Sequence, residues 1–172
     1  KILSLIKLNI TGYYYTCCHV WYPNYTNITN CYSDGSVHGT DGNDGGLIGS
    51  CYASDINNCY SDASVSGGSY AIDGLIGEVW SGSTVNNCYG TGSVSGIYGY
   101  VGGVTGRLYA ADLSNCYSEA SVSAEGDVSE NVGGLVGETY GSTISNCYSI
   151  GSVSAVGDES EDVGGLVGDV GG

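Results

Sequence analysis

The sequence of 172 residues contains no methionine, no phenylalanine and a single proline, and only three of its residues are lysine or arginine. Set against 18 aspartate and glutamate residues, these three bases leave a formal net charge of -15. A surface of that charge repels phosphate backbones and anionic lipid, so nucleic acid is excluded as a partner. No apolar run approaches the roughly 18 residues of a transmembrane helix, so no membrane span is expected.

Glycine and tyrosine are abundant instead, and they recur in two fixed phrases. The first phrase joins NCY to SVS, and its copies occupy residues 28–38, 56–66, 85–95, 113–123 and 144–154. The second phrase is GLIG, GVTG or GLVG, at residues 46–49, 74–77, 103–106, 134–137 and 165–168. The cysteines of the first phrase are 28, 29, 28 and 31 residues apart. A period of this size predicts a repeat architecture, and the lack of a 3.6-residue apolar pattern excludes helical repeats.

Short β-like runs separated by Gly, Ser, Asn and Asp predict an all-β fold. We expect a right-handed parallel β-solenoid of about five coils of 28–31 residues, with three short strands per coil through the NCY, SVS and GLVG phrases. Residues 28–172 form this repeat domain. Residues 1–27 do not follow the repeat and are expected to be an irregular segment, acting as a cap or as an inter-subunit strand.

The two phrases together resemble the GLUG repeat, which is named for its Gly-Leu-hydrophobic-Gly signature and occurs in bacterial and archaeal surface proteins. The resemblance covers residues 28–172, and only GVTG at 103–106 departs from the leucine of the signature. It implies an extracellular protein at the cell surface, often an adhesive one. It supplies no catalytic motif that could be transferred to this chain.

Stacked coils place equivalent residues about 4.8 Å apart, so each repeat position becomes a ladder. Alternation along residues 59–66 puts the cysteine inside, which predicts a core cysteine ladder of Cys31, Cys59, Cys88, Cys116 and Cys147. We expect these thiols to be compact core side chains, because parallel Cβ vectors about 4.8 Å apart do not suit a disulfide and the chain lacks the CxxC-like spacing of zinc sites. Three further cysteines lie near the N-terminal end, where one disulfide would close a cap: Cys17, Cys18 and Cys51.

Aromatic residues form two more ladders. The first comprises Tyr32, Tyr60, Tyr89, Tyr117 and Tyr148, and the second comprises Tyr52, Trp80, Tyr109 and Tyr140. Stacked rings on adjacent strands stabilise a sheet, and an aromatic strip also binds sugar rings or a neighbouring protein. The sequence leaves both roles open, with surface glycans or other cell-surface proteins as the partners of the second role.

Acidic residues gather on the variable loops, and like charges on adjacent coils would be relieved by solvent or by a divalent cation. Oxygen ligands without histidine suit Ca²⁺, so Ca²⁺ is the one cofactor considered; solvated turns are the alternative. The candidate ligands are Asp41, Asp44, Asp127, Glu130, Asp158 and Glu161. Three sequons begin at Asn9, Asn24 and Asn27, and they are either N-glycosylation sites on exposed turns or chance matches in an Asn- and Thr-rich segment.

Three functions compete. The first is a non-enzymatic extracellular structural protein, whose solenoids stack end to end into a surface filament as a head-to-tail homopolymer. The second is the repeat stalk or binding module of a longer cell-surface adhesin. The third is a β-helical carbohydrate-active enzyme, which the scarcity of basic residues disfavours, since the repeats hold Arg107 and His38 but no activated nucleophile. We therefore expect no enzymatic activity and no catalytic residue.

Overall fold

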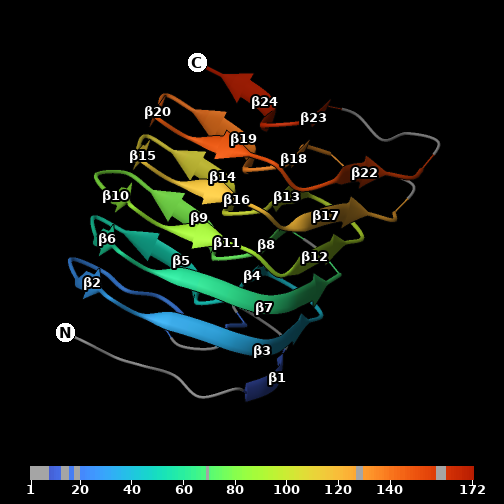
Figure 1. Ribbon diagram of the computed structural model, residues 1–172, viewed down its shortest axis with the longest axis horizontal. Coiled ribbons are helices and arrows are strands. Elements are labelled where there is room, and N and C mark those ends of the chain that lie inside the picture. The colour runs from blue at the N-terminus through green and yellow to red at the C-terminus, as the bar shows by residue number, and fades with distance from the viewer. Residues whose placement is uncertain (1–7, 13–15, 18–19, 69, 127–129, 158–161) are drawn as a thin grey trace.

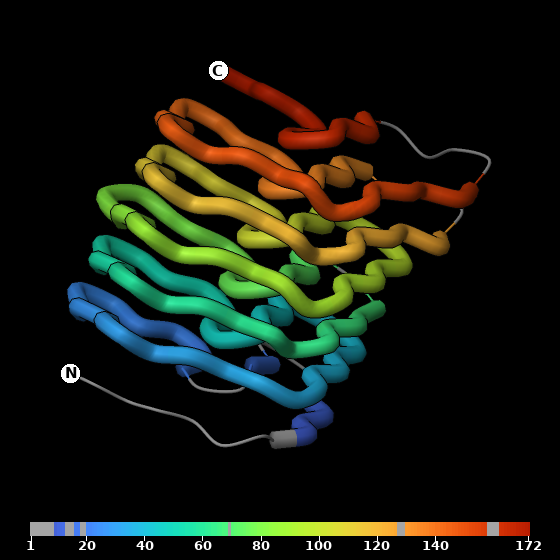
Figure 2. Tube along the Cα trace, in the orientation of Figure 1, coloured from blue at the N-terminus to red at the C-terminus, as the bar shows by residue number. Residues whose placement is uncertain are grey.

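The computed structural model describes residues 8–12, 16–17, 20–68, 70–126, 130–157 and 162–172 (Figure 1). All regular elements of this described part are β-strands, and all of their pairings are parallel. The coils stack on one another from the N-terminal to the C-terminal end (Figure 2). The predicted all-β solenoid of about five coils is confirmed.

The strands form four parallel sheets, each named here for its strand in the second coil. The β6 sheet contains β2 (Asn27–Thr29), β6 (Asp55–Asn57), β10 (Thr84–Asn86), β15 (Asp112–Ser114) and β20 (Thr143–Ser145). The β7 sheet contains β1 (Leu8–Gly12), β3 (Tyr32–Gly39), β7 (Tyr60–Gly67), β11 (Tyr89–Gly90), β12 (Ser93–Gly96), β16 (Tyr117–Ser118), β17 (Ser121–Ala124), β21 (Tyr148–Ser149) and β22 (Val153–Ala155). The β8 sheet contains β4 (Asn43–Gly45), β8 (Ala71–Asp73), β13 (Tyr100–Gly102), β18 (Val132–Gly133) and β23 (Val163–Gly164). The β9 sheet contains β5 (Ile48–Tyr52), β9 (Ile76–Trp80), β14 (Thr105–Tyr109), β19 (Val136–Tyr140) and β24 (Val167–Gly171).

The expectation of three strands per coil was wrong, because each coil passes through four sheets. The NCY and SVS phrases share the β7 sheet, as one long strand in the first two coils and as two shorter strands in the later ones. The added elements are short strands before each cysteine and before each GLUG phrase. The cysteine and the Gly-Leu pair are therefore the corners of the coil.

Residues that tolerate unusual backbone geometry form these corners. An asparagine precedes each ladder cysteine with φ between 52° and 57°, in the left-handed region that asparagine enters more readily than most residues: Asn30, Asn58, Asn87, Asn115 and Asn146. At the other corner, a Cβ on Gly74 would overlap the carbonyl oxygen of Gly103 in the next coil. The first glycine of the signature is therefore required by the close approach of successive coils.

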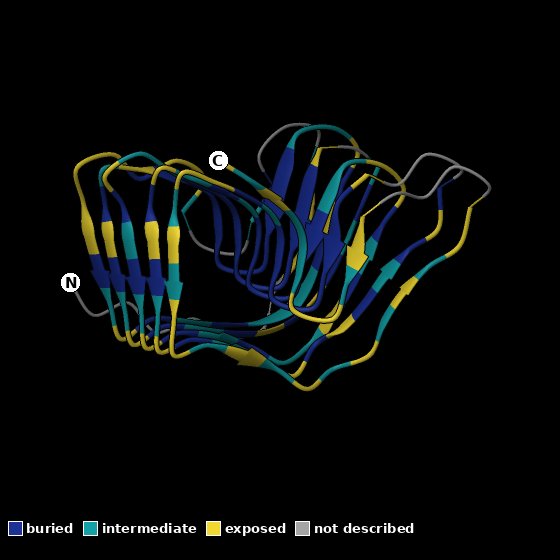
Figure 3. Ribbon diagram, turned by 90° about the horizontal axis from the view of Figure 1, so that it is seen from above, coloured by how far each residue is buried: buried dark blue, intermediate teal, exposed yellow. Residues whose placement is uncertain are grey.

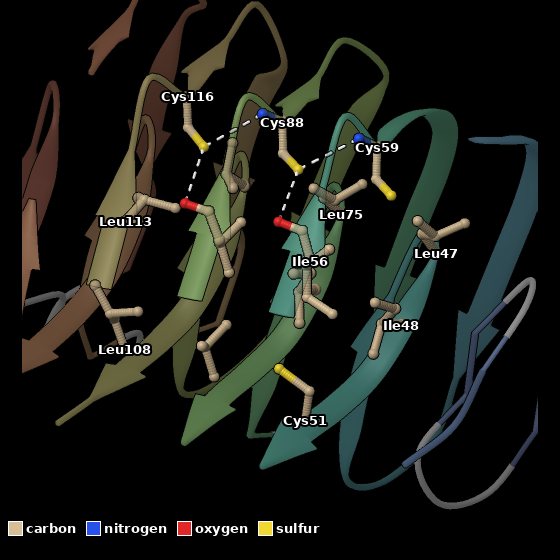
Figure 4. Close-up of a cluster of buried hydrophobic side chains, with 14 of the residues drawn as sticks. Leu47, Ile48, Cys51, Ile56, Cys59, Leu75, Cys88, Leu108, Leu113 and Cys116 are labelled. Atoms are coloured by element: carbon tan, nitrogen blue, oxygen red, sulfur yellow. Dashed lines mark hydrogen bonds between the residues drawn. The ribbon is translucent and has the colours of Figure 1, made fainter. Parts of the chain in front are cut away.

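Two hydrophobic clusters fill the coil. The larger one lies between the β6, β7 and β9 sheets and contains the ladder cysteines together with residues such as Leu75 and Ile56 (Figure 4). The smaller one lies between the SVS half of the β7 sheet and the β8 sheet, around Val65 and Ile72. Between them, glycines such as Gly103 pack against serines such as Ser118. Seen from above, the strands of each sheet lie side by side around this interior (Figure 3).

The N-terminal segment is stacked on the solenoid more fully than its sequence predicts. Strand β1 pairs with β3 through contacts such as Ile10 with Val37. Further parallel bridges join Cys17 to Gly45, Val20 to Ile48 and Asn24 to Tyr52. The expectation of an irregular segment is therefore corrected: within residues 8–27, the described residues form a partial coil that covers the first repeat of the same chain.

Candidate functional site

The cysteine ladder lies at the corner between the β6 and β7 sheets. Cys31, Cys59, Cys88 and Cys116 are buried and Cys147 is half-buried. The backbone N–H of Cys59 donates to Cys88 Sγ at 3.3 Å, and that of Cys88 donates to Cys116 Sγ at 3.4 Å (Figure 4). Each of these two acceptor thiols also contacts the carbonyl oxygen two residues before it, such as Cys88 Sγ with Asn86 at 3.2 Å. The thiols thus satisfy corner N–H groups that would otherwise be buried without a partner.

A serine ladder accepts equivalent hydrogen bonds at the corner that precedes the strands of the β6 sheet. The backbone N–H of Thr26 donates to Ser54 Oγ at 3.1 Å, and that of Ser54 donates to Ser83 Oγ at 3.2 Å. Two coils later, Ala111 N–H donates to Ser142 Oγ at 3.2 Å. Because serine and cysteine serve the same structural role at matching corners, the cysteine ladder is explained by the architecture of the coil.

The expected disulfide is absent at Cys51. This thiol is not disulfide-bonded, and its Sγ lies 4.0 Å from Ser83 Oγ in the core. Burial raises the pKa of Cys51 to about 12, so the side chain stays protonated at neutral pH. Cys17 is half-buried beside Gly45, and Cys18 lies outside the described residues. Cys51 forms no disulfide because its side chain lies in the larger hydrophobic cluster, in register with Val79.

The first aromatic ladder is uniform. Adjacent rings from Tyr32 to Tyr148 stack with centroids 4.7–5.2 Å apart and interplanar angles of 3–9°. Each ring lies at the same place on the outer face of the β7 sheet, in register with the tyrosine of the next coil. Stacking of equivalent rings is what the coil spacing imposes, and it stabilises adjacent strands.

The second aromatic ladder, on the outer face of the β9 sheet, is not uniform. The Trp80 and Tyr109 rings are tilted by 44°, and Tyr25 meets Tyr52 edge-on. Beside this ladder runs a column that holds a different residue in nearly every coil. In register from the first coil to the last, its members are Ser50, Glu78, Arg107, Glu138 and Asp169.

Arg107 is the centre of this irregular region. Its Nε donates to Glu138 Oε2 at 2.7 Å, and its Nη1 lies 4.0 Å from Glu78 Oε1. Its guanidinium carbon lies 5.0 Å from the Tyr100 ring centroid and 5.4 Å from that of Trp80. The Arg107 cluster is defined here as Asn43, Glu78, Trp80, Tyr100, Arg107 and Glu138. Asn43 and Tyr100 come from the β8 sheet and the others from the β9 sheet, so the cluster lies where the outer faces of these sheets meet.

Polar bonds inside the cluster hold Glu78 in place. Glu78 Oε2 accepts from Asn43 Nδ2 at 2.6 Å and from Trp80 Nε1 at 2.8 Å. Burial raises the pKa of Glu78, an effect that these bonds and Arg107 partly offset. Only Arg107 of this cluster was considered from the sequence in connection with chemistry, and Trp80 only as a ladder member. The signal that could have marked the cluster is the change of residue type, coil by coil, at one repeat position.

Among the described residues, the acidic residues considered for Ca²⁺ do not form a metal site. Asp44 is fully buried, in register with Ile72, and its Oδ1 accepts from Thr16 N–H at 3.1 Å. It therefore lies in the core, apart from a solvated calcium loop. Asp41 lies at a partly exposed bend and Glu130 is exposed. Asp127, Asp158 and Glu161 lie outside the described residues. Among the residues that are described, no group of three His, Cys, Asp or Glu side chains is placed to hold a metal ion.

The three sequon asparagines are exposed. Asn9 accepts from Ser36 Oγ at 2.9 Å, and Asn24 and Asn27 lie on the N-terminal partial coil and its junction with β2. Their side chains are accessible for glycosylation, which depends on the cellular context of the protein.

The C-terminal coil presents apolar side chains that are covered in the coil before it. Leu135 and Val136 are fully buried, whereas Leu166 is 39% exposed and Val163 is 49% exposed. The strands β20, β23 and β24 stand at the ends of their sheets. Within the described part of residues 1–172, no further coil covers these strand edges or the apolar side chains beside them.

Residues 97–123 and 124–154 match the GLUG motif, so the prediction of GLUG repeats is confirmed for this part of the chain. The fold is similar to the crystal structure of a "putative immunoglobulin A1 protease from Bacteroides ovatus", with a TM-score of 0.68 and 29% sequence identity. The match covers 85% of this chain and 48% of that chain, so this chain spans about half the length of that protein. No curated protein sequence matches the chain. In the described part of the chain, no helix is long and apolar enough to cross a membrane.

Proposed function

We propose that this chain is a non-enzymatic structural protein of the extracellular surface, whose solenoids stack end to end into a filament. The C-terminal end face carries the proposal, because Leu166 and Val163 continue columns whose members in the preceding coil, Leu135 and Val132, are fully buried. Covering them with one more coil would stabilise the joint by about 25 cal/mol for each Å² of apolar surface that it buries.

The opposite end supplies a matching face. The N-terminal partial coil presents half-buried Ile10 and Val20, which continue the columns of Val37 and Ile48. In the proposed joint, this coil meets the C-terminal coil of the preceding subunit without leaving its own chain. The two faces are different surfaces, so repeated joining gives an open polymer.

Assembly is tested by electron microscopy and sedimentation of the intact chain at increasing concentration. We expect elongated particles that lengthen with concentration. Leu166→Lys places a charge on the end face and should leave monomers, whereas Ile97→Lys, at an exposed loop in the middle of the stack, should still assemble. An intact chain that stays monomeric at every concentration contradicts the filament.

The second candidate is the repeat stalk or binding module of a longer cell-surface adhesin. It is favoured by the match to the Bacteroides ovatus structure, in which this fold accounts for 48% of a longer chain. In that arrangement, further coils of the same chain would cover Leu166. The intact chain would then remain monomeric, and adding the natural flanking sequence would protect the amides of β24 from hydrogen exchange.

Catalysis is not part of this proposal, although the similar structure has a title that names a protease. A Ser–His contact does exist, since His38 Nδ1 lies 2.9 Å from Ser66 Oγ. It lies on the outer face of the β7 sheet, where His38 takes the position that Ser66 has in the next coil. The Oε2 atom of Glu138 is bonded to Arg107 Nε at 2.7 Å, so this carboxylate is already engaged in an ion pair. Cleavage of immunoglobulin A1 that is lost on Ser66→Ala would overturn this part.

A structural role needs no cofactor, and Ca²⁺ remains a proposal for the acidic loops of two adjacent coils, with Asp127, Glu130, Asp158 and Glu161 as its ligands. Like charges on these adjacent coils repel, and a cation would reduce that repulsion. If Ca²⁺ binds, a chelator lowers the melting temperature and added Ca²⁺ restores it. An unchanged melting temperature shows solvated turns.

A further inference from the structure

A cavity of about 400 Å³ opens beside the Arg107 cluster. Its lining includes Asn43, Tyr70, Glu78, Trp80 and Arg107. This volume lies within the range of roughly 300–1,000 Å³ that small-molecule sites occupy. The cavity lies at the corner between the β8 and β9 sheets, and it uses no surface that the proposed end-to-end joint requires.

Two buried acceptors at this cavity have no hydrogen-bond partner among the described residues: Asn43 Oδ1 and Glu78 Oε1. Asn43 is 4% exposed and Glu78 is 5% exposed. Their other polar atoms, Asn43 Nδ2 and Glu78 Oε2, are already bonded to each other. A buried acceptor left unpaired costs about 1–3 kcal/mol. The site is therefore built for an occupant that donates hydrogen bonds to both oxygens.

Aromatic rings form one side of the same space. Trp80 lines the cavity and its indole N–H is already bonded to Glu78 Oε2 at 2.8 Å, which fixes the plane of the ring. Tyr70 also lines the cavity and meets Tyr100 edge-on at 6.2 Å. A fixed indole face is a surface on which the C–H face of a sugar ring packs well, and Tyr70 can add an amphipathic edge.

The charges of the site select against ionic ligands. Glu78 and Glu138 flank the single guanidinium of Arg107, Asp41 lines the same cavity, and the whole chain carries a net charge of -15. An acidic sugar would be repelled by these carboxylates. A cationic group would meet the like charge of Arg107, which already pairs with Glu78 and Glu138. A neutral ligand with several hydroxyl groups meets neither obstacle.

We propose that this cavity binds one or two residues of a neutral saccharide. Hydroxyl groups donate to Asn43 Oδ1 and Glu78 Oε1, and Arg107 donates to a ring or hydroxyl oxygen. One pyranose face packs on Trp80. The residues that would do this are departures from the repeat: Asn43 aligns with Ala71, and Glu78 aligns with Ser50 and Arg107. Stacking of the coils alone does not require them.

The chain has two tryptophans, Trp21 and Trp80, so Trp21→Phe leaves Trp80 as the only indole. In this background, Trp80 fluorescence is titrated with neutral, uronate-containing and sialylated oligosaccharides, and binding is checked by calorimetry. We expect saturable binding of a neutral oligosaccharide and no binding of the acidic ones.

Variants then locate the site. Glu78→Gln replaces one carboxylate oxygen with an amide NH₂ group of nearly the same shape, so one acceptor for the sugar is lost. This change should weaken binding at least about tenfold, as should Trp80→Ala measured by calorimetry. Asp112→Asn makes the same exchange of carboxylate for amide at an exposed position away from the cavity and should leave affinity unchanged. Circular dichroism checks that each variant is folded. If Glu78→Gln does not fold, Asn43→Ala is tested in its place.

Three results overturn the proposal: no saturable binding by neutral sugars at about 10 mM, binding only of acidic sugars, or equal affinity in Glu78→Gln and the parent. None of them bears on filament assembly, which is measured without sugar. Conversely, a chain that remains monomeric can still bind saccharide at this cavity.

Discussion

The two aromatic ladders differ, although both lie on outer faces of the same solenoid. On the β7 sheet, one residue type repeats and neighbouring rings stay within 9° of parallel. On the β9 sheet, Trp80 interrupts the tyrosines at a tilt of 44° to Tyr109, beside the mixed column that contains Arg107. The stack imposes the same coil spacing on both ladders. The difference must therefore come from a requirement other than stacking.

The comparison separates what the architecture explains from what it does not. A residue that repeats in every coil is accounted for by its neighbours above and below, as the tyrosines and the corner cysteines are. A residue that departs from its column in a single coil is not. Asp44, which stands among Ile72 and Val101 in one apolar column, is a departure of this kind. Glu78 and Arg107 stand in a column that has no common residue, so stacking does not explain them either. Substitutions of these two classes should have different consequences.

The largest effect is expected at Asp44. Burial raises the pKa of Asp44 from 3.8 to about 6, so the folded state holds this proton more tightly than the unfolded state. The contribution of Asp44 to stability is fully present below about pH 4 and is lost as pH rises through 6. Asp44→Asn removes the charge while its Oδ1 can still accept from Thr16 N–H. The variant should be more stable than the parent by about 3 kcal/mol at pH 7 and by little at pH 4.

Urea unfolding at pH 4, 5, 6 and 7 measures this difference, with Asp112→Asn as the exposed control. Burial also raises the pKa of Asp73 and of Glu78, so the variant retains part of the parent's loss of stability above pH 4. If the free energies of unfolding of Asp44→Asn and the parent change in parallel with pH, the buried charge of Asp44 does not destabilise the fold.

The second effect concerns Arg107. Arg107→Gln leaves Glu78 buried without its cationic neighbour, and it also removes the 2.7 Å bond to Glu138. We expect a loss of about 2 kcal/mol, smaller than the roughly 3–5 kcal/mol of a fully buried pair because Arg107 is partly exposed. Adding Glu78→Gln should restore part of the loss, since the uncompensated charge is then gone. A double variant that is less stable than Arg107→Gln contradicts this account.

Much of the fold could be predicted because stacked coils require equivalent residues at a regular spacing in the sequence. The spacing of the cysteines fixes the coil, and alternation from Cys59 to Ser66 gives the correct inside and outside faces. The β6 and β8 sheets could not be predicted in this way, because strands as short as Asp55–Asn57 and Ala71–Asp73 hold too few residues to show alternation. The asparagine before each cysteine is the available signal, since its left-handed backbone marks a corner.

The N-terminal coil and the Arg107 cluster were missed for different reasons. The partial coil is held largely by backbone contacts, such as Val20 N–H to Leu47 C=O at 3.2 Å, and these require no particular side chain. The cluster brings Asn43 and Tyr100 from one sheet to Glu78 and Arg107 from another. Which outer faces meet depends on how sharply the coil turns at Gly-Leu, and the repeat period does not contain that angle.

A smaller effect is expected at Cys88, a repeating position. Cys88→Ala removes the sulfur that accepts from Cys59 N–H at 3.3 Å and leaves a small cavity. The expected cost is about 1–2 kcal/mol. Cys88→Ser should cost less than the alanine variant, because Ser83 Oγ accepts the equivalent bond at the other corner. Both costs come from urea unfolding under reducing conditions, and an equal cost for the two variants would show that the hydrogen bond contributes nothing.

The smallest effect is expected in the uniform ladder, where the number of ring neighbours decides the size. Tyr89 lies between Tyr60 at 4.9 Å and Tyr117 at 4.7 Å, whereas Tyr148 has one ring neighbour among the described residues, Tyr117 at 5.1 Å. Tyr89→Ala should therefore cost about 1 kcal/mol and Tyr148→Ala about half of that, with saccharide affinity unchanged in both. Tyr89→Phe keeps both stacked contacts and should cost almost nothing. Urea midpoints of the three variants give the comparison. Equal costs for Tyr89→Ala and Tyr148→Ala would mean that ring stacking does not stabilise the ladder, and the regular columns would then need a functional explanation of their own.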